Sequence, residues 1–212
     1  MKLPKPGSVL MVIDVQKAVD FMDVEKPAAN PGWGGRNNPD AEAKAARLLA
    51  HWRQREWPVW HVRHDSLDPQ SHYRPGQEGN DFKLEVAPLP GEPVIPKQTN
   101  SAFIGTGLEA KLRSAGHDSL VILGVSSNNS VEATVRMAGN LGFDAYLVAD
   151  ASFTYGQKDW NGTPRTANDV HAMALANMDG EYCTVLNTGD LLEEADRPVR
   201  DRARASEIRG RS

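Results

Sequence analysis

Three side chains that could work together in catalysis stand where short apolar runs of the sequence end. Asp14 closes the run VLMVID, Lys97 closes PVIPK, and Ser130 lies in the polar turn SSNNS that follows LVILGV. A carboxylate, an ammonium group and a hydroxyl can supply a proton acceptor, a positive charge and a nucleophile, which are groups that covalent hydrolysis uses. The elements around them decide whether these groups meet.

The turn SSNNS lies between a predicted strand, LVILGV, and a predicted helix. The helix is indicated by small or apolar residues at helical spacing, namely Val131, Thr134, Val135 and Ala138. In an open α/β sheet the carboxyl end of such a strand faces the ligand crevice, and the free N–H groups of the following helix point there. Ser130 is thus placed for chemistry, although Ser and Asn in this turn can equally serve only as an N-cap.

Asp14 interrupts a continuous run of Val, Ile and Leu, the pattern of a strand covered on both faces. A carboxylate there costs free energy unless it has a partner, so Asp14 is either a satisfied structural residue or a catalytic one. Lys97 follows another short apolar run and leads into QTNSAF. A lone lysine is usually solvated, yet this one has the same place relative to its strand as Asp14.

The composition of the 212 residues argues against several classes of protein. The net charge is −4 with both signs spread along the chain, so there is no basic stripe for nucleic acid. The sequence has neither G-x-G-x-x-G after the first strand nor a P-loop motif, and no cofactor is expected. The first apolar run is too short to span a membrane or to be an ordinary signal peptide. A single cysteine, Cys183, excludes an internal disulfide and agrees with a cytoplasmic location.

Apolar runs alternate with amphipathic segments along the chain. About six strands and about five helical segments are expected, which favours parallel βαβ units on one sheet and the α/β class. We predict strands at 8–15, 58–62, 93–97, 120–125, 144–150 and 182–186, and helices at 40–52, 105–115, 131–141 and 170–178. Long loops are expected at 21–39 and 66–82, and a polar loop at 152–169. One domain, 1–191, is expected to precede a charged tail, 192–212.

His61 and His64 lie on or just after a predicted strand. Residues three apart on a strand point to opposite faces, so one metal ion could not easily take both as ligands. No metal site is therefore expected. His64, at the strand end, is interpreted as a candidate for lining the substrate site.

Three segments in a fixed order resemble the isochorismatase-like family of cysteine hydrolases: VIDVQ, VIPKQTNSAF and ILGVSSNNSVEATVRMAGNLGF. They match the family hallmarks K-x-x-x-S-A-F and, except for Ser130 at the position of the cysteine, G-V-x-[ST]-x-x-C-V-x-x-T-x-R-x-A, and the likeness covers residues 9–191. The resemblance implies a three-layer, doubly wound, mostly parallel six-stranded Rossmann-like sheet with helices on both faces. It also implies a homo-oligomer, a dimer or tetramer, that hydrolyses an amide or ureide C–N bond of a small molecule.

The family triad, carried over residue by residue, makes Asp14 the general base, Lys97 its charged partner and Ser130 the residue at the nucleophile position. Backbone N–H groups at Val125, Ser126 and Ser130 would then form the oxyanion hole. The resemblance further implies a cis peptide bond before Ser126. Four aromatic side chains are candidates for the substrate pocket or for the core, namely Phe21, Trp33, Phe82 and Phe103.

The family hydrolases have Cys where this chain has Ser130. A thiol, with an ordinary pKa of about 8.5, becomes a thiolate beside a lysine and a helix N-terminus, whereas a hydroxyl needs a base as it attacks. Asp14 held by Lys97 is a weak base for an alcohol. We therefore expect a hydrolase of reduced activity, either a natural variant or an engineered, substrate-trapping form. Cys183 is interpreted as a small core residue.

Two other functions remain open at the level of sequence. One is a small-molecule binding protein that keeps the pocket without the chemistry. The other is a vinyl-ether hydrolase of the isochorismatase type, which uses Asp14 and no covalent nucleophile. In all three readings the partner is a small molecule.

Overall fold

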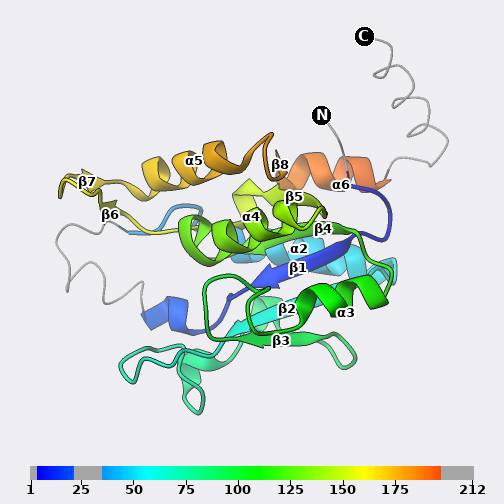
Figure 1. The fold of residues 1–212 in the computed structure, drawn as a ribbon, viewed down its shortest axis with the longest axis horizontal. Helices are drawn as coiled ribbons and strands as arrows, with labels where there is room; N and C mark the ends of the chain where they lie inside the picture. Colours follow the sequence, from blue (N-terminus) through cyan, green and yellow to red (C-terminus); the bar gives the residue numbers. More distant parts are fainter. Residues whose placement is uncertain (1–3, 22–34, 197–212) are drawn as a thin grey trace, which may run out of the picture.

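A six-stranded parallel sheet forms the centre of the molecule in the computed structural model, which describes residues 4–21 and 35–196 (Figure 1). The strand order is β3-β2-β1-β4-β5-β8. The strands are β1 (Val9–Ile13), β2 (Val59–His64), β3 (Val94–Lys97), β4 (Ser119–Gly124), β5 (Asp144–Val148) and β8 (Thr184–Leu186). Their ladders are all parallel, so the predicted α/β class is confirmed.

The two central strands, β1 and β4, are buried along their whole length, which explains their nearly continuous apolar sequences VLMVI and SLVILG. They pair in the register Ile13 with Gly124, so both end at the same edge of the sheet. From β1 the chain adds β2 and then β3 on one side of the sheet. It then crosses to the other side of β1, where it adds β4, β5 and β8. The carboxyl ends of β1 and β4 therefore flank the topological switch point, where open α/β sheets bind ligands.

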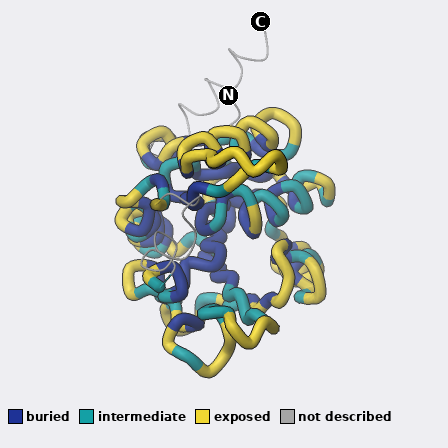
Figure 2. The backbone as a smooth tube through the Cα atoms, turned by 90° about the vertical axis from the view of Figure 1, so that its left-hand side faces the viewer, coloured by how far each residue is buried: buried dark blue, intermediate teal, exposed yellow. Residues whose placement is uncertain are grey.

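Helices cover both faces of the sheet. Helices α3 (Leu108–Ser114), α4 (Glu132–Asn140) and α5 (Ala167–Met178) share one apolar cluster with Val9, Met11 and Ile13. Helices α2 (Ala41–Gln54) and α6 (Thr188–Asp196) share the opposite cluster with Leu10 and Val12. Alternate residues of β1 thus enter two different cores, as the period of a strand requires. Figure 2 shows buried backbone at the centre of the molecule and exposed backbone around it.

A short antiparallel hairpin, β6 (Gln157–Lys158) and β7 (Pro164–Arg165), occupies part of the segment for which a loop was predicted. The Asp159 side chain closes its turn by accepting the N–H groups of Asn161 and Thr163 and by pairing with Arg165. Strands of two polar residues carry no alternating apolar pattern. The Asn-Gly pair at 161–162 was the one local hairpin signal.

Shorter elements complete the described part of the chain. The predicted loop at 66–82 contains the 3-10 turn Glu78–Asn80, and another, Leu84–Val86, follows it. Helix α6 runs across the predicted domain boundary at residue 191, where Leu191 is buried in the α2 cluster. Residues 197–212 of the predicted tail lie outside the described residues. No helix within 4–21 and 35–196 has both the length and the apolar character needed to cross a membrane.

Candidate active site

Asp14, Lys97 and Ser130 meet at the carboxyl edge of the sheet. Asp14 follows β1, Lys97 ends β3, and Ser130 lies in a π-helical turn, Ser127–Val131, that leads from β4 into α4. The Lys97 ammonium nitrogen donates to Asp14 Oδ2 at 2.6 Å and to Ser130 Oγ at 3.2 Å. The three residues are only 3, 2 and 8 % exposed, respectively. The structure therefore brings the three predicted catalytic residues together in a buried cluster.

The sheet register explains how Lys97 reaches Asp14 from two strands away. His64, the last residue of β2, pairs with Lys97, whereas the last residue of β1, Ile13, pairs with Val62. The contact of 2.6 Å between the Lys97 ammonium and Asp14 Oδ2 thus joins β3 to the residue after β1 across the end of β2. Asp14 itself has φ 56°, in the left-handed region that aspartate tolerates better than most residues. This backbone conformation turns the chain out of β1 at the carboxylate.

The ammonium group of Lys97 is fully occupied by protein atoms. Besides Asp14 and Ser130 it donates to the carbonyl oxygen of Thr99 at 3.1 Å, and His64 Nδ1 lies 3.4 Å away. A lysine has three N–H donors, so these acceptors account for all of them. Burial, followed by the charge of Lys97, lowers the pKa of His64, which is therefore neutral near pH 7.

One oxygen of the Asp14 carboxylate, Oδ2, accepts the hydrogen bond of Lys97, and the other is buried. Burial raises the pKa of Asp14, although the charge and hydrogen bond of Lys97, the Ser130 hydroxyl and His64 oppose that increase. Its Oδ1 atom is buried and has no hydrogen-bond partner within the described residues. A buried acceptor of this kind is costly unless a ligand N–H or O–H satisfies it. Asp14 is thus equipped to take a proton from a bound molecule and to return it.

Close approach of β1 and β4 sets the position of the turn Ser127–Val131, which carries Ser130. A Cβ atom on Gly124 would lie 2.1 Å from the carbonyl oxygen of Ile13, and Gly124 has φ 140°. Only glycine fits there, because any side chain would push apart the strands that carry Asp14 and Ser130. The peptide bond between Val125 and Ser126, which follows directly, is cis, as the family resemblance implied.

Hydrogen bonds in the turn distinguish among the predicted oxyanion donors. The Val125 N–H already donates to Ile13 O at 3.0 Å, so it continues the sheet. The Ser126 carbonyl accepts the N–H groups of Asn129 and Val131 at 3.0 and 3.2 Å. Within the described residues the Ser126 N–H has no acceptor. Among the predicted donors, Ser126 is thus the better candidate than Val125.

Sequence reasoning missed Gln16, which holds the end of β2 beside the site. Gln16 is fully buried, and its Oε1 accepts the His64 N–H at 2.8 Å. Its Nε2 donates to the carbonyl oxygens of His64 and Asn80, at 3.1 and 2.8 Å. The Gln16 side chain therefore links the segment that follows β1 to both β2 and the 3-10 turn at 78–80. The sequence signal that could have identified Gln16 is its place at the end of the motif VIDVQ.

The other predicted pocket residues take different positions. Phe21 is partly buried and stacks on His72 with ring centroids 4.7 Å apart. The His64 ring lies edge-on to the Tyr73 ring, with centroids 5.6 Å apart. Two rings of the loop 66–82, His72 and Tyr73, therefore contact Phe21 and His64, respectively. Trp33 lies outside the described residues.

Phe82 and Phe103 contact other layers of the fold. Phe103 packs against Phe143, with centroids 5.7 Å apart, beside the α3 and α4 core. Phe82 lies edge-on to His61 at 5.7 Å. His61 is wholly buried and shares a hydrogen bond of 2.8 Å with Glu92, away from His64. In the described part of the chain no three His, Cys, Asp or Glu side chains are grouped as metal ligands.

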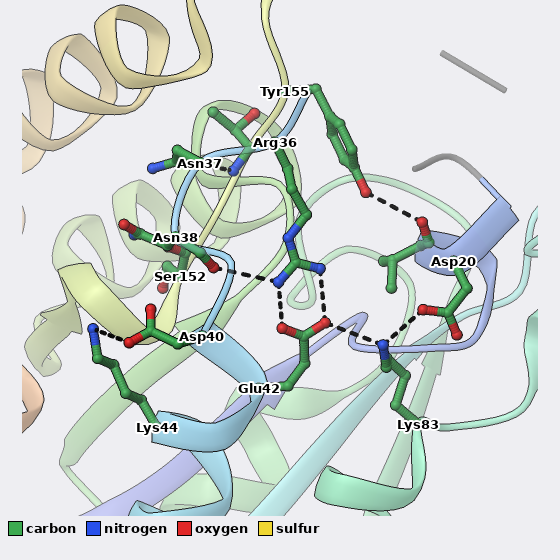
Figure 3. Close-up of polar contacts among 12 residues, drawn as sticks. Asp20, Arg36, Asn37, Asn38, Asp40, Glu42, Lys44, Lys83, Ser152 and Tyr155 are labelled. Atoms are coloured by element: carbon green, nitrogen blue, oxygen red, sulfur yellow. Dashed lines mark hydrogen bonds and ion pairs between the residues drawn. The ribbon is translucent and has the colours of Figure 1, made fainter. Parts of the chain in front are cut away.

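A chain of ion pairs joins the segments on either side of residues 22–34 (Figure 3). Lys83 contacts Asp20 at 2.7 Å and Glu42 at 3.2 Å, and Glu42 also pairs with Arg36. Arg36 in turn lies over the Phe153 ring at 3.8 Å. The backbone of Phe153 accepts the Ser127 N–H and donates to the carbonyl oxygen of Gly124. The ion pairs and the Arg36–Phe153 contact therefore link Asp20 and Lys83 to the segment that pairs with the turn carrying Ser130.

Comparison with known proteins gives the same family as the sequence motifs. The family model for the isochorismatase domain matches residues 8–190. An uncharacterized isochorismatase family protein of Bacillus subtilis, YrdC, is 38% identical over 182 residues, which cover 86% of this chain and 97% of YrdC. Ureidoacrylate amidohydrolase RutB of Pseudomonas syringae is 29% identical over 181 residues, covering 72% of this chain and 73% of RutB.

The solved structure of an isochorismatase-family protein from Chromobacterium violaceum is 55% identical and superposes with a TM-score of 0.81, covering 91% of this chain and 97% of that one. A cysteine hydrolase from Pseudomonas syringae pv. phaseolicola, 19% identical with a TM-score of 0.77, shares the fold. The family match spans both strands that carry Asp14 and Lys97 and the turn that carries Ser130. The chain therefore belongs to the isochorismatase family of hydrolases.

Proposed function

We propose that this chain hydrolyses a C–N bond of a small amide or ureide through Asp14, Lys97 and the side chain at position 130. The observation that carries the proposal is the position of the Lys97 ammonium, bonded to Asp14 at 2.6 Å and to Ser130 at 3.2 Å. One buried cation then serves both groups, because it keeps the base beside the nucleophile and stabilises negative charge that develops on either.

The proposed reaction has two halves. In the first, the Ser130 oxygen adds to the substrate carbonyl carbon and its proton passes to Asp14, which gives that proton to the departing nitrogen as the C–N bond breaks. In the second, Asp14 takes a proton from water, which attacks the acyl group, and the Ser130 oxygen leaves with that proton. The Ser126 N–H, without an acceptor in the described residues, is the proposed donor to the carbonyl oxygen.

The polar groups of the site favour a substrate with an N–H donor. Lys97 has no N–H left to bind a substrate carboxylate, whereas Asp14 Oδ1 is a buried acceptor without a partner in the described residues. An amide or ureide nitrogen beside the reacting carbonyl fits that acceptor. The relationship to proteins named ureidoacrylate amidohydrolase supports the same class.

Because position 130 carries a hydroxyl group, we expect slow turnover of the substrate. A hydroxyl attacks only as its proton is removed, and Asp14 bonded to Lys97 is a weak base. Removal of an enzyme's nucleophile costs about 10⁴- to 10⁶-fold in rate, and replacement of a thiol by a hydroxyl at this position acts in the same direction. We therefore propose that the chain binds its substrate and turns it over slowly.

Turnover of a panel of primary amides and N-carbamoyl compounds tests this proposal. Ser130→Cys should raise kcat/KM at least about 10³-fold on the preferred compound, and Ser130→Ala should abolish the activity of the native chain. Binding of a panel compound by both variants, with no gain from Ser130→Cys, would instead identify a binding protein without chemistry.

A vinyl-ether substrate belongs in the same panel because burial raises the pKa of Asp14 and so favours its acid form. Vinyl-ether cleavage that is unchanged in Ser130→Ala and lost in Asp14→Asn would show that the chain is a vinyl-ether hydrolase and would contradict the proposed amide hydrolysis. Cleavage of an amide that depends on position 130 would exclude that route.

We further propose that the chain works in the cytoplasm as a homodimer or homotetramer. Its single cysteine, Cys183, is buried and free, which suits a reducing compartment. Light scattering of the purified protein measures the assembly, and a monomer at micromolar concentration would contradict it.

A further inference from the structure

Helix α5 contributes a buried histidine to the turn that carries Ser130, outside the triad. His171 Nδ1 lies 2.7 Å from Ser127 Oγ. Both side chains are buried, since Ser127 is 0 % and His171 8 % exposed. Ser127 is the first residue of the π-helical turn that carries Ser130. The contact therefore joins an element distant in sequence to the segment that positions the nucleophile.

The contact between His171 and Ser127 forms with either tautomer of the ring. A neutral imidazole has one donor and one acceptor nitrogen, so Nδ1 either accepts the Ser127 hydroxyl proton or donates to Ser127 Oγ. Burial lowers the pKa of His171, and the backbone of Ala149, the residue after β5, opposes that change. The ring is therefore neutral near pH 7.

Ser127 is fixed by its backbone as well. Its N–H donates to Phe153 O at 2.9 Å, and the preceding carbonyl, of Ser126, accepts the N–H groups of Asn129 and Val131. With the backbone of Ser127 held on one side and its hydroxyl held on the other, the start of the turn has little freedom to rotate. The distance from Ser130 to Lys97 depends on that rotation.

We propose that His171 is a positioning residue that acts through the Ser127 hydroxyl to hold the side chain at position 130 within reach of Lys97. The inference rests on the function proposed above, in which position 130 reacts. It assigns no direct contact with substrate to His171. The expected effect falls on kcat, because the reacting atom moves while the substrate-binding groups stay in place.

The test uses the Ser130→Cys protein, in which the state of the thiol can be measured without any substrate. His171→Leu should lower the thiolate fraction at pH 7, and the rate of alkylation by iodoacetamide, about tenfold, because the thiol moves away from the Lys97 charge. The amide-panel kcat should fall by up to about 100-fold at nearly constant KM. Cys183 gives little background, since burial raises its pKa to about 12.

Two further variants separate positioning from simple support of the fold. His171→Asn keeps both a donor and an acceptor for Ser127, so it should restore most of the thiolate fraction. Ser127→Ala removes only the hydroxyl and should reproduce the loss, while the double variant with His171→Leu should lose no more than either alone. The melting temperature of each variant shows whether it remains folded at the temperature of the assay.

The proposal is overturned if His171→Leu or, where that variant does not fold, Ser127→Ala leaves the alkylation rate unchanged. Additive effects of the two substitutions would overturn it as well. Because alkylation needs no turnover, these outcomes are distinct from failure of the proposed hydrolysis, which would show as an alkylated thiol in a protein that cleaves no amide.

Discussion

Replacing Ser130 by Cys places a thiol beside the buried ammonium group of Lys97, whose charge favours ionisation of the thiol. Unit charges 3.2 Å apart, the Lys97 to Ser130 separation, attract by about 5 kcal/mol at an effective dielectric constant of about 20. The Asp14 carboxylate, which also interacts with the side chain at position 130, and the burial of the site both oppose this attraction. Thiols beside a cation and a helix N-terminus have pKa values lowered to about 3.5–7.5, and the upper part of that range corresponds to a net stabilisation of about 2 kcal/mol for the thiolate.

That stabilisation raises the ratio of thiolate to thiol about thirtyfold. An ordinary thiol is about 3 % ionised at pH 7, so the introduced thiol should be about half ionised there. Absorbance at 240 nm as a function of pH measures the thiolate directly. The native chain supplies the background, since burial raises the pKa of Cys183, its single cysteine, to about 12.

Lys97→Met in the Ser130→Cys protein is the matched control. It removes the cation and keeps the length of the side chain, so the thiolate fraction at pH 7 should fall to a few per cent or below. An introduced thiol that ionises to the same extent with and without Lys97 would refute the electrostatic reasoning. The same result would remove the central argument for the role of Lys97.

Three further predictions concern other charges of the molecule. Asp14→Asn in the Ser130→Cys protein should reduce amide turnover more than about 100-fold while iodoacetamide still alkylates the thiol; retained turnover would contradict the role of the carboxylate. Glu42→Gln should cost about 3 to 5 kcal/mol in urea unfolding because it removes the carboxylate that Arg36 and Lys83 share, whereas Arg36→Met should cost less because Lys83 still pairs with Glu42. The double variant should cost less than the sum of the two, and strict additivity would contradict the pairing. Burial of Glu92 is outweighed by hydrogen bonds that lower its pKa from 4.5 to about 2, so its stabilising contribution is present above pH 4.5 and lost as the pH falls towards 2. The difference in unfolding free energy between the native chain and Glu92→Gln should shrink over that range, and a difference independent of pH would contradict this.

The main elements of the fold could be predicted from local sequence patterns. The apolar run that ends at Asp14 indicated a strand covered on both faces, and LVILGV indicated a second strand; the structure buries every residue of β1 and β4. Asp14 and Lys97 stood out because a charge at the end of an apolar run is costly without a partner. Each is in fact the other's partner, at 2.6 Å, although they are 83 residues apart.

The missed features depend on contacts between distant segments. Gln16 and His171 act through hydrogen bonds to segments far away in the sequence, and neither composition nor periodicity reports such bonds. Thr99 acts through its backbone carbonyl, a group that is the same in every residue and therefore gives no signal in the sequence. His171 was assigned to a helix from its apolar neighbours, but its partner Ser127 lies 44 residues earlier. The β6–β7 hairpin was missed because strands of two residues are too short to show alternation.

The central claim is that position 130 attacks a carbonyl carbon, and intact-protein mass spectrometry tests it most directly. The Ser130→Cys protein is quenched with acid during turnover of its preferred amide, and the modified peptide is then mapped. The account predicts a mass increase equal to the acyl part of the substrate, located at position 130 and absent from Ser130→Ala treated in the same way. Turnover without an adduct, or an adduct on another residue, would contradict it.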